Sequence, residues 1–198
     1  MIVIGLTGGI AMGKSEVAKV FVSEGIPVFD SDREVHRLYD SKEGADLLAA
    51  LAPSAVSDGK VDRTALSALV LADPALLAKL EALVHAEIRT RRQAFIAAEK
   101  SKGTEMVVLD VPLLLETGGD RDVDVTVVVS AGEEIQRRRA LARPGMTEEK
   151  LALVLKRQMA DAEKRRRAHH LIETTGTIEE LRARVLAVIA QIRKEKRS

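Results

Sequence analysis

The 198-residue chain contains no cysteine and no tryptophan, and aromatic residues make up only 2% of it. Without cysteine the fold has no disulfide, the chemistry has no thiol nucleophile, and no metal site can use a Cys ligand. No stretch approaches the length of about 18 consecutive apolar residues that a membrane span requires, and the four histidines lack zinc-site spacing. We therefore expect a soluble protein of the cytoplasm, with no membrane partner.

An excess of either charge is also missing, because 31 basic residues nearly cancel 30 acidic ones and leave a net charge of +1. This balance argues against a general affinity for nucleic acid or for a membrane surface. The length suits one α/β domain with insertions. Any preference for anions must be local, and we expect a monomer or a weak homo-oligomer.

A glycine-rich motif near the N-terminus is the strongest signal in the chain. Residues 8–15 read GGIAMGKS, a complete GxxxxGK(S/T) phosphate-binding loop, and they follow the apolar run 2–6. Backbone N–H groups of such a loop surround phosphate oxygens, and we expect Gly8 and Gly13 to be needed for its backbone angles. Lys14 is expected to reach the β- and γ-phosphates of a nucleotide, and Ser15 to ligate Mg²⁺. The structural alternative is an ordinary glycine-rich turn between a strand and a helix.

Alternating strand and helix patterns predict an α/β fold with a parallel sheet wrapped by helices. Strands are expected at residues 2–7, 26–29, 106–111, 123–129 and 170–173. The first helix should run from residue 13 to about 23 and stop near Gly25. An amphipathic helix is expected at 177–196, with a frayed basic end at 193–197 and with one apolar side formed by Ile178, Leu181, Val185, Val188, Ile189 and Ile192.

Two segments are too long or too irregular to be simple connections within the core, which comprises residues 1–30, 102–136 and 168–198. Residues 31–101 have helical periodicity and predict an inserted helical lobe. Residues 137–167 hold eleven basic and four acidic residues, with a break at Arg143-Pro144-Gly145 and a helix cap expected at Thr147. This pattern predicts a mobile, basic helical lid.

Carboxylates at strand ends are candidates for catalysis and metal binding. Asp30 and Asp32 follow the second expected strand, and either could serve as the base or instead cap the next helix. Asp110 ends the strand 106–110 in the manner of a Walker B element, which would hold the Mg²⁺ shell. Asp110 and Glu116 could equally be solvated turn residues.

Candidate cations lie in the lid and in the helical lobe. Arg143, at the break, is the first choice to close over ATP phosphates, and Arg157 is the second, because a guanidinium can donate two hydrogen bonds to phosphate oxygens. In the lobe the candidates are Arg63 and His85. A lone histidine on an apolar helix is often only a packed, hydrogen-bonded residue.

Several short motifs together resemble the dephospho-coenzyme A kinase family over nearly the whole chain. They are residues 6–10 leading into 13–15, Asp30-Ser31-Asp32, residues 61–63 with Leu66, residues 80–85, residues 111–116, and Arg157-Gln158. Ala11-Met12 stands where Gly-Ser is more usual, Ala86 where a proline follows the histidine, and Thr174 where the family has asparagine.

The resemblance implies a three-layer P-loop kinase fold with a five-stranded parallel sheet, a helical acceptor lobe and a helical lid. It implies ATP-dependent, Mg²⁺-requiring phosphorylation of the 3′-hydroxyl of dephospho-coenzyme A. The alternatives are a kinase of the same fold for a nucleoside monophosphate or another small alcohol, and a nucleotide-dependent switch. The expected catalytic residues are Lys14, Asp32 and Arg143; the ATP-binding residues are Gly8, Gly9, Ile10, Ala11, Met12, Gly13, Lys14, Ser15, Glu16, Arg143 and Arg157; the acceptor-binding residues are Asp32, Arg63, His85, Leu113 and Glu116; and the metal ligands are Ser15 and Asp110.

Overall fold

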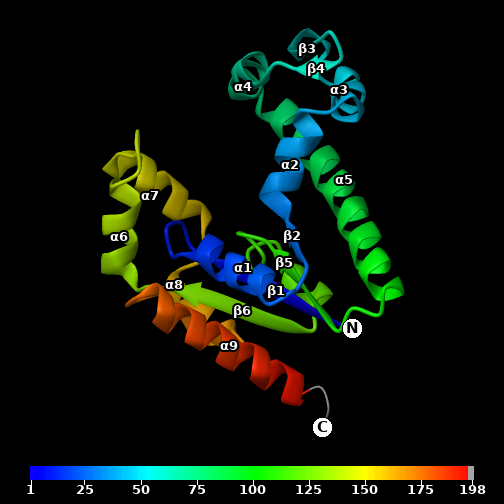
Figure 1. Cartoon of the computed structure of the whole chain (residues 1–198). Coiled ribbons are helices and arrows are strands. Elements are labelled where there is room, and N and C mark those ends of the chain that lie inside the picture. The colour runs from blue at the N-terminus through cyan, green and yellow to red at the C-terminus, as the bar shows by residue number, and fades with distance from the viewer. Residues whose placement is uncertain (196–198) are drawn as a thin grey trace. The chain divides into compact units, whose positions relative to one another are not determined.

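The computed structural model describes residues 1–195, and five strands in it form one sheet (Figure 1). The strands are β1 (Ile2–Gly8), β2 (Val28–Asp30), β5 (Met106–Asp110), β6 (Val125–Ser130) and β7 (His170–Glu173), in the order β2-β5-β1-β6-β7. Strand β1 runs parallel to β5 and to β6, and β6 runs parallel to β7. The predicted five-stranded parallel sheet of an α/β fold is therefore confirmed.

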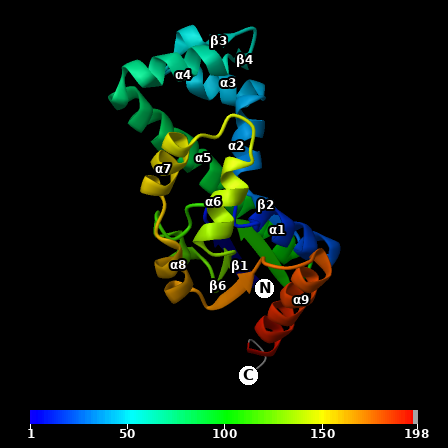
Figure 2. The ribbon, with the colours of Figure 1, turned by 90° about the vertical axis from the view of Figure 1, so that its left-hand side faces the viewer.

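Helices α1 (Lys14–Ser23) and α9 (Ile178–Glu195) lie side by side and share one apolar core with the strands (Figures 1 and 2). Val17 and Phe21 of α1 are fully buried, as are Val185 and Ile192 of α9. Ile178 was predicted to join this apolar side, but its side chain is 63% exposed because it lies in the first turn of the helix. Of the predicted frayed end, Lys196 and Arg197 lie outside the described residues.

The chain forms two compact units, one of residues 1–29 with 99 onward and one of Asp30–Ala98. The second unit contains α2 (Ser31–Tyr39), α3 (Lys42–Ala49), η1 (Pro53–Ala55), β3 (Val56–Ser57), β4 (Lys60–Val61), α4 (Arg63–Ala72) and most of α5 (Pro74–Ser101). Its own apolar core includes Leu38, Leu48, Leu66, Leu80 and Val84. Helix α5 runs unbroken through His85 and Ala86, as expected where no proline interrupts it.

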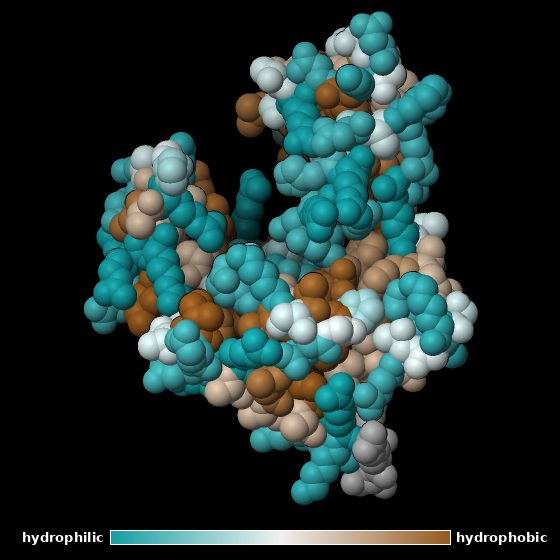
Figure 3. Space-filling model, viewed as in Figure 1, coloured by the Kyte–Doolittle hydropathy of each residue, from teal (hydrophilic) through white to brown (hydrophobic). Residues whose placement is uncertain are grey.

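Three helices of the first unit carry the basic segment. They are α6 (Glu133–Leu141), α7 (Glu148–Arg157) and α8 (Asp161–Arg167), and a further short turn, η2 (Gly119–Asp122), precedes β6. The predicted break after residue 141 is confirmed, and so is the cap, because Thr147 Oγ1 accepts a hydrogen bond from Lys150 N at 3.3 Å. The visible surface over α6 and α7 is mostly hydrophilic (Figure 3). Within residues 1–195, no helix is long and apolar enough to cross a membrane.

Candidate active site

The loop between β1 and α1 has two residues in the left-handed region, Gly13 with φ 89° and Ala11 with φ 60°. A Cβ on Gly13 would lie 3.0 Å from Thr174 Oγ1, so glycine is needed there for both its backbone angle and its size. For Gly8 the predicted reason was wrong, because its φ is not left-handed. A Cβ on Gly8 would instead lie 2.7 Å from the Val129 carbonyl oxygen of the neighbouring strand.

Lys14 and Asp110 meet at the loop. The Lys14 ammonium forms an ion pair with Asp110 Oδ1, and the Asp110 residue is only 3% exposed. The register of the sheet explains the contact, because Asp110 at the end of β5 lies opposite Leu6 of β1, shortly before the loop begins. The structure thus brings together two residues that the sequence placed in the site.

The donors near the loop fit a magnesium ion. Among residues 1–195 the Ser15 hydroxyl makes no hydrogen bond, and no group of three or more histidine and carboxylate side chains could hold a metal by itself. Mg²⁺ usually takes only one or two protein oxygens and completes its shell with water and substrate phosphates. One hydroxyl and one buried carboxylate therefore suit this ion.

Asp30 and Asp32 have different roles in the structure. Asp30 is the N-cap of α2, and its Oδ1 accepts a hydrogen bond from Arg33 N at 3.0 Å. Asp32 lies exposed in the first turn of α2, and its carboxylate has no hydrogen bond or ion pair within the described chain. The capping alternative thus applies to Asp30 and leaves the Asp32 carboxylate free to bind a ligand.

Arg63 and His85 lie in the second unit. Arg63 Nη2 donates to Asp40 Oδ1 at 2.8 Å and to the His36 carbonyl at 3.1 Å, and its guanidinium lies 5.9 Å from the centre of the Tyr39 ring. Burial raises the pKa of Tyr39, and the charge of Arg63 opposes this shift. His85 is exposed on α5 and makes no hydrogen bond among residues 1–195, so it is not the packed, bonded histidine that was the alternative.

In the basic segment 137–167, one arginine that the sequence did not single out contacts the loop through Thr174. Arg139 Nη2 donates to the Thr174 carbonyl at 2.8 Å, and the Thr174 hydroxyl donates to the Met12 carbonyl at 2.6 Å. The only signal for Arg139 was its membership of a basic run. Arg143 and Arg157 are exposed, and their guanidinium groups have no partner in the described chain.

Glu116 takes part in a buried ion pair beside the loop. Its Oε1 lies 2.8 Å from Lys164 Nζ and also accepts a hydrogen bond from Met159 N at 2.8 Å. The nearby Leu113 is 37% exposed, whereas Lys164 is fully buried. Lys164 was missed from the sequence, since it belongs to a run of basic residues that looked solvated.

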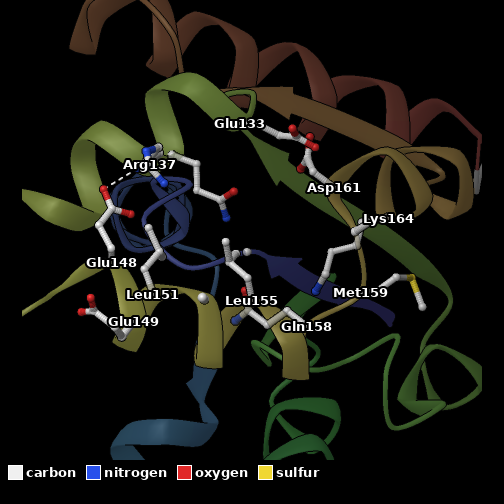
Figure 4. A pocket seen from close by; sticks show the side chains of 14 residues that line it. Glu133, Arg137, Glu148, Glu149, Leu151, Leu155, Gln158, Met159, Asp161 and Lys164 are labelled. Atoms are coloured by element: carbon white, nitrogen blue, oxygen red, sulfur yellow. Dashed lines mark hydrogen bonds and ion pairs between the residues drawn. The ribbon is translucent and has the colours of Figure 1, made fainter.

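Lys164 lines a cavity of about 740 Å³ in the first unit, next to Gly9 of the loop (Figure 4). Side chains of α6 and α7 form other walls, among them Arg137 and Glu148, which are joined by an ion pair. Glu149 is a further lining residue. Hydrogen bonds from the Thr147 hydroxyl and from the backbone N–H of Glu149 itself lower the pKa of the Glu149 carboxyl. The wall of the cavity therefore contains charged groups of both signs.

Comparison with known proteins identifies the family. The dephospho-CoA kinase family model matches residues 2–180. A dephospho-CoA kinase of Mesorhizobium japonicum is 52% identical over 198 residues and covers 100% of both chains. A crystal structure from Thermus thermophilus is 38% identical with a TM-score of 0.77 and covers 96% of this chain and 97% of the other.

The structure of a dephospho-CoA kinase from Campylobacter jejuni has 22% identity, a TM-score of 0.69 and 96% coverage of both chains, and it supports the fold alone. The family match, in contrast, extends over almost the whole sequence, including the loop, Asp30, Asp32 and the basic segment 137–167. The chain therefore belongs to the dephospho-CoA kinase family.

Proposed function

We propose that this protein transfers the γ-phosphoryl group of ATP to the 3′-hydroxyl of the ribose of dephospho-coenzyme A, which gives coenzyme A and ADP in the last step of coenzyme A biosynthesis. One observation carries the proposal: a phosphate-binding loop that contains Lys14 lies in a chain that is 52% identical over its full length to a dephospho-CoA kinase. We also propose a cytoplasmic monomer or weak homo-oligomer without a nucleic-acid partner.

The loop Gly8–Ser15, with Glu16 in the first turn of α1, binds the ATP phosphates. Its backbone N–H groups and the N-terminus of α1 supply partial positive charge. Lys14 is paired with Asp110. On binding, its ammonium exchanges this carboxylate for β- and γ-phosphate oxygens, where it stabilises the charge that develops during transfer.

Ser15 and Asp110 hold Mg²⁺, directly or through water. When bound, the ion neutralises charge on the β- and γ-phosphates. Ser15 offers a hydroxyl that makes no hydrogen bond within residues 1–195, and Asp110 a carboxylate at the end of a buried strand. Both donors are oxygens, as this hard cation prefers.

Asp32 accepts the proton of the acceptor hydroxyl, and Asp30 supports it by fixing the first turn of α2. Arg63, His85, Leu113 and Glu116 contribute to acceptor binding, and the unit of residues 30–98 supplies most of that contact. Arg143 closes over the phosphates with the lid, and Arg157 assists. Both guanidinium groups lack a partner in the described chain, so neither must break a bond to reach a phosphate.

Two isosteric substitutions test the assignment of the base. Asp32→Asn removes the proton acceptor, so we expect turnover to fall about 10²–10⁴-fold while the affinity for Mg·ATP changes little. Asp30→Asn keeps a capping oxygen, because asparagine caps helices as well as aspartate does, and should retain most of the activity. Steady-state kinetics and nucleotide titrations measure both variants. If turnover collapsed in Asp30→Asn and stayed normal in Asp32→Asn, Asp30 would be the base and Asp32 would not.

An acceptor panel tests the substrate. A coupled assay of ADP release should respond to dephospho-coenzyme A and not to adenosine monophosphate, other nucleoside monophosphates or simple sugars. Preference for a nucleoside monophosphate would replace the proposed substrate but keep the kinase chemistry. ATP hydrolysis that no acceptor stimulates would instead indicate a nucleotide-dependent switch.

A further inference from the structure

Two side-chain amides hold the peptide groups of Ile10 from both sides. Ile10 N–H donates to Gln158 Oε1 at 3.0 Å, and the Ile10 carbonyl accepts from Gln136 Nε2 at 3.0 Å. Gln136 belongs to α6 and is only 6% exposed, and Gln158 is the C-cap of α7. Both backbone groups of one loop residue are therefore satisfied by side chains of the lid segment.

Gly9 makes room for these amides. A Cβ on Gly9 would lie 2.7 Å from Gln136 Nε2 and 3.5 Å from Gln158 Oε1. The GxxxxGK(S/T) motif leaves this position variable, so phosphate binding alone does not require glycine here. The space is taken by the two glutamines.

Apolar packing continues the contact on the next residue. Ala11 is 8% exposed and forms a buried cluster with Ala140 of α6 and Leu151 of α7. Its φ of 60° is a conformation that residues other than glycine rarely adopt. The hydrogen bonds on Ile10 and the packing of the Ala11 methyl group hold the loop in this shape.

We propose that Gln136 and Gln158 are positioning residues for phosphoryl transfer. They fix the Ile10 peptide, keep Ala11 left-handed, and thereby preorganise the N–H groups that follow for the ATP phosphates. Because Gln158 follows Arg157 directly, the same bond fixes the end of α7 that carries this arginine. The inference rests on the proposed binding of ATP by the loop, and neither glutamine needs to touch a phosphate.

The opposite hydrogen-bonding roles of the two glutamines allow a matched test. Gln158→Glu keeps an oxygen that accepts from Ile10 N–H. Gln136→Glu loses the donor and sets a carboxylate against the Ile10 carbonyl. Both variants add one negative charge to the wall of the same cavity (Figure 4). Gln191→Glu, at an exposed position of α9, controls for the charge alone.

The readout is the Kd for Mg·ATP from calorimetric titration without acceptor, together with urea unfolding of each variant. We expect Gln136→Glu to weaken Mg·ATP binding about tenfold or more at pH 8, as for the loss of one hydrogen bond, and Gln158→Glu to weaken it about threefold or less. Gln136→Leu and Gln158→Leu should each weaken Mg·ATP binding about tenfold. Stability in urea should stay close to that of the parent for Gln158→Glu, which keeps the hydrogen bond to Ile10 N–H.

A pH series makes the test independent of folding defects. As the pH falls from about 8 to about 5, the buried carboxylate introduced by Gln136→Glu takes up a proton and becomes a donor, so the affinity of this variant should recover toward the parent. The affinity of Gln158→Glu relative to the parent should stay nearly constant over the same range, because a carboxyl group keeps an oxygen that accepts from Ile10 N–H in either protonation state.

Equal affinities and parallel pH curves for the two glutamate variants would overturn the proposal. If the parent chain binds Mg·ATP but does not phosphorylate dephospho-coenzyme A, the proposed function fails while the role of the two glutamines is still decided by these titrations. Turnover with dephospho-coenzyme A then measures the second proposed effect of Gln158, which is to fix the end of α7 that carries Arg157. This effect should lower kcat in addition to changing the Kd for Mg·ATP.

Discussion

Gly13 shows how a single position can combine two requirements. Its φ of 89° disfavours every residue with a Cβ, and the Cβ would also meet Thr174, whose hydroxyl is bonded to the Met12 carbonyl. Gly25, at the end of α1, has a similar φ of 73° but no atom within 4 Å of the position of a Cβ. The two glycines therefore separate the cost of backbone strain from the cost of a clash.

Gly13→Ala and Gly25→Ala should each reduce the free energy of unfolding by about 1–2 kcal/mol through left-handed strain. Only Gly13→Ala should also weaken Mg·ATP binding, by about tenfold or more, because the loop must move away from Thr174. Chemical unfolding and nucleotide titration measure the two effects. An equal loss of nucleotide affinity in both variants would contradict the role given to the contact with Thr174.

The pairing of Lys14 with Asp110 mixes stability with catalysis, and a double variant separates them. Lys14→Ala leaves the buried Asp110 carboxylate without its ammonium, so the free energy of unfolding should fall by about 1–3 kcal/mol. Turnover should fall about 10²-fold or more, because a cation aimed at the transferred phosphoryl group is lost.

Adding Asp110→Asn removes the buried negative charge that Lys14 neutralised and should restore part of the stability lost in Lys14→Ala. Turnover of the double variant should stay as low as that of Lys14→Ala. Stopped assays with saturating ATP and urea unfolding compare the parent, Lys14→Ala and the double variant. Recovery of turnover together with stability would mean that Lys14 acts only through folding.

Among the elements, those with strong local signals were predictable from the sequence. The five strands of the sheet and the break after α6 follow from apolar runs and from Arg143-Pro144-Gly145. The hairpin β3–β4 was missed because each strand has only two residues, although Asp58-Gly59 is a typical turn signal and both residues have positive φ.

The site was predictable where a motif names residues, and less so where contacts come from distant segments. Lys14 and Asp110, which the structure brings into contact, were predicted for the site because each ends or follows a recognisable strand. Gln136, Arg139 and Lys164 contact the site through tertiary packing, over 35 to 126 residues of sequence, and their local sequence is an ordinary basic helix. Periodicity indicates which face of a helix is buried but does not name the partner.

The turn between α5 and β5 contains a pH-dependent contact. Glu99 accepts hydrogen bonds from Lys102 Nζ at 2.6 Å and from Thr104 Oγ1 at 2.8 Å, and these bonds hold the pKa of its carboxyl below the usual 4.5. A carboxyl with a lowered folded-state pKa stabilises the fold above its unfolded pKa, and this contribution is lost as the pH falls through the folded value.

Glu99→Gln should therefore lower the midpoint of thermal unfolding at pH 7, and the difference from the parent should shrink as the pH falls to about 3. Glu81→Gln, an exposed residue of the same helix without an ion pair in the described chain, is the control and should shift the midpoint little at either pH. Scanning calorimetry at several pH values makes the comparison. A difference that stays constant with pH would show that the Glu99 contact is not charge-dependent.

At the scale of the whole molecule, the residues proposed to bind ATP and those proposed to bind the acceptor lie mainly in different compact units. The loop, Asp110 and the lid belong to the first unit, whereas Asp32, Arg63 and His85 belong to the second, Asp30–Ala98. The sequence predicts an acceptor lobe at 31–101, and the ligands themselves can test this assignment. Each ligand should protect backbone amides mainly in the unit that holds its partners.

Hydrogen exchange with Mg·ATP should slow the amides of residues 9–17 most, because the loop and the first turn of α1 bind the phosphates. Dephospho-coenzyme A should slow amides within residues 30–98, above all in the first turn of α2 around Asp32 and near Arg63, since these residues are proposed to contact the acceptor. Coenzyme A, the product, should give the same pattern, whereas adenosine monophosphate at equal concentration controls for weak binding of the adenine group. Protection by dephospho-coenzyme A confined to the first unit would remove residues 30–98 from acceptor binding and leave their compact fold without a part in the reaction.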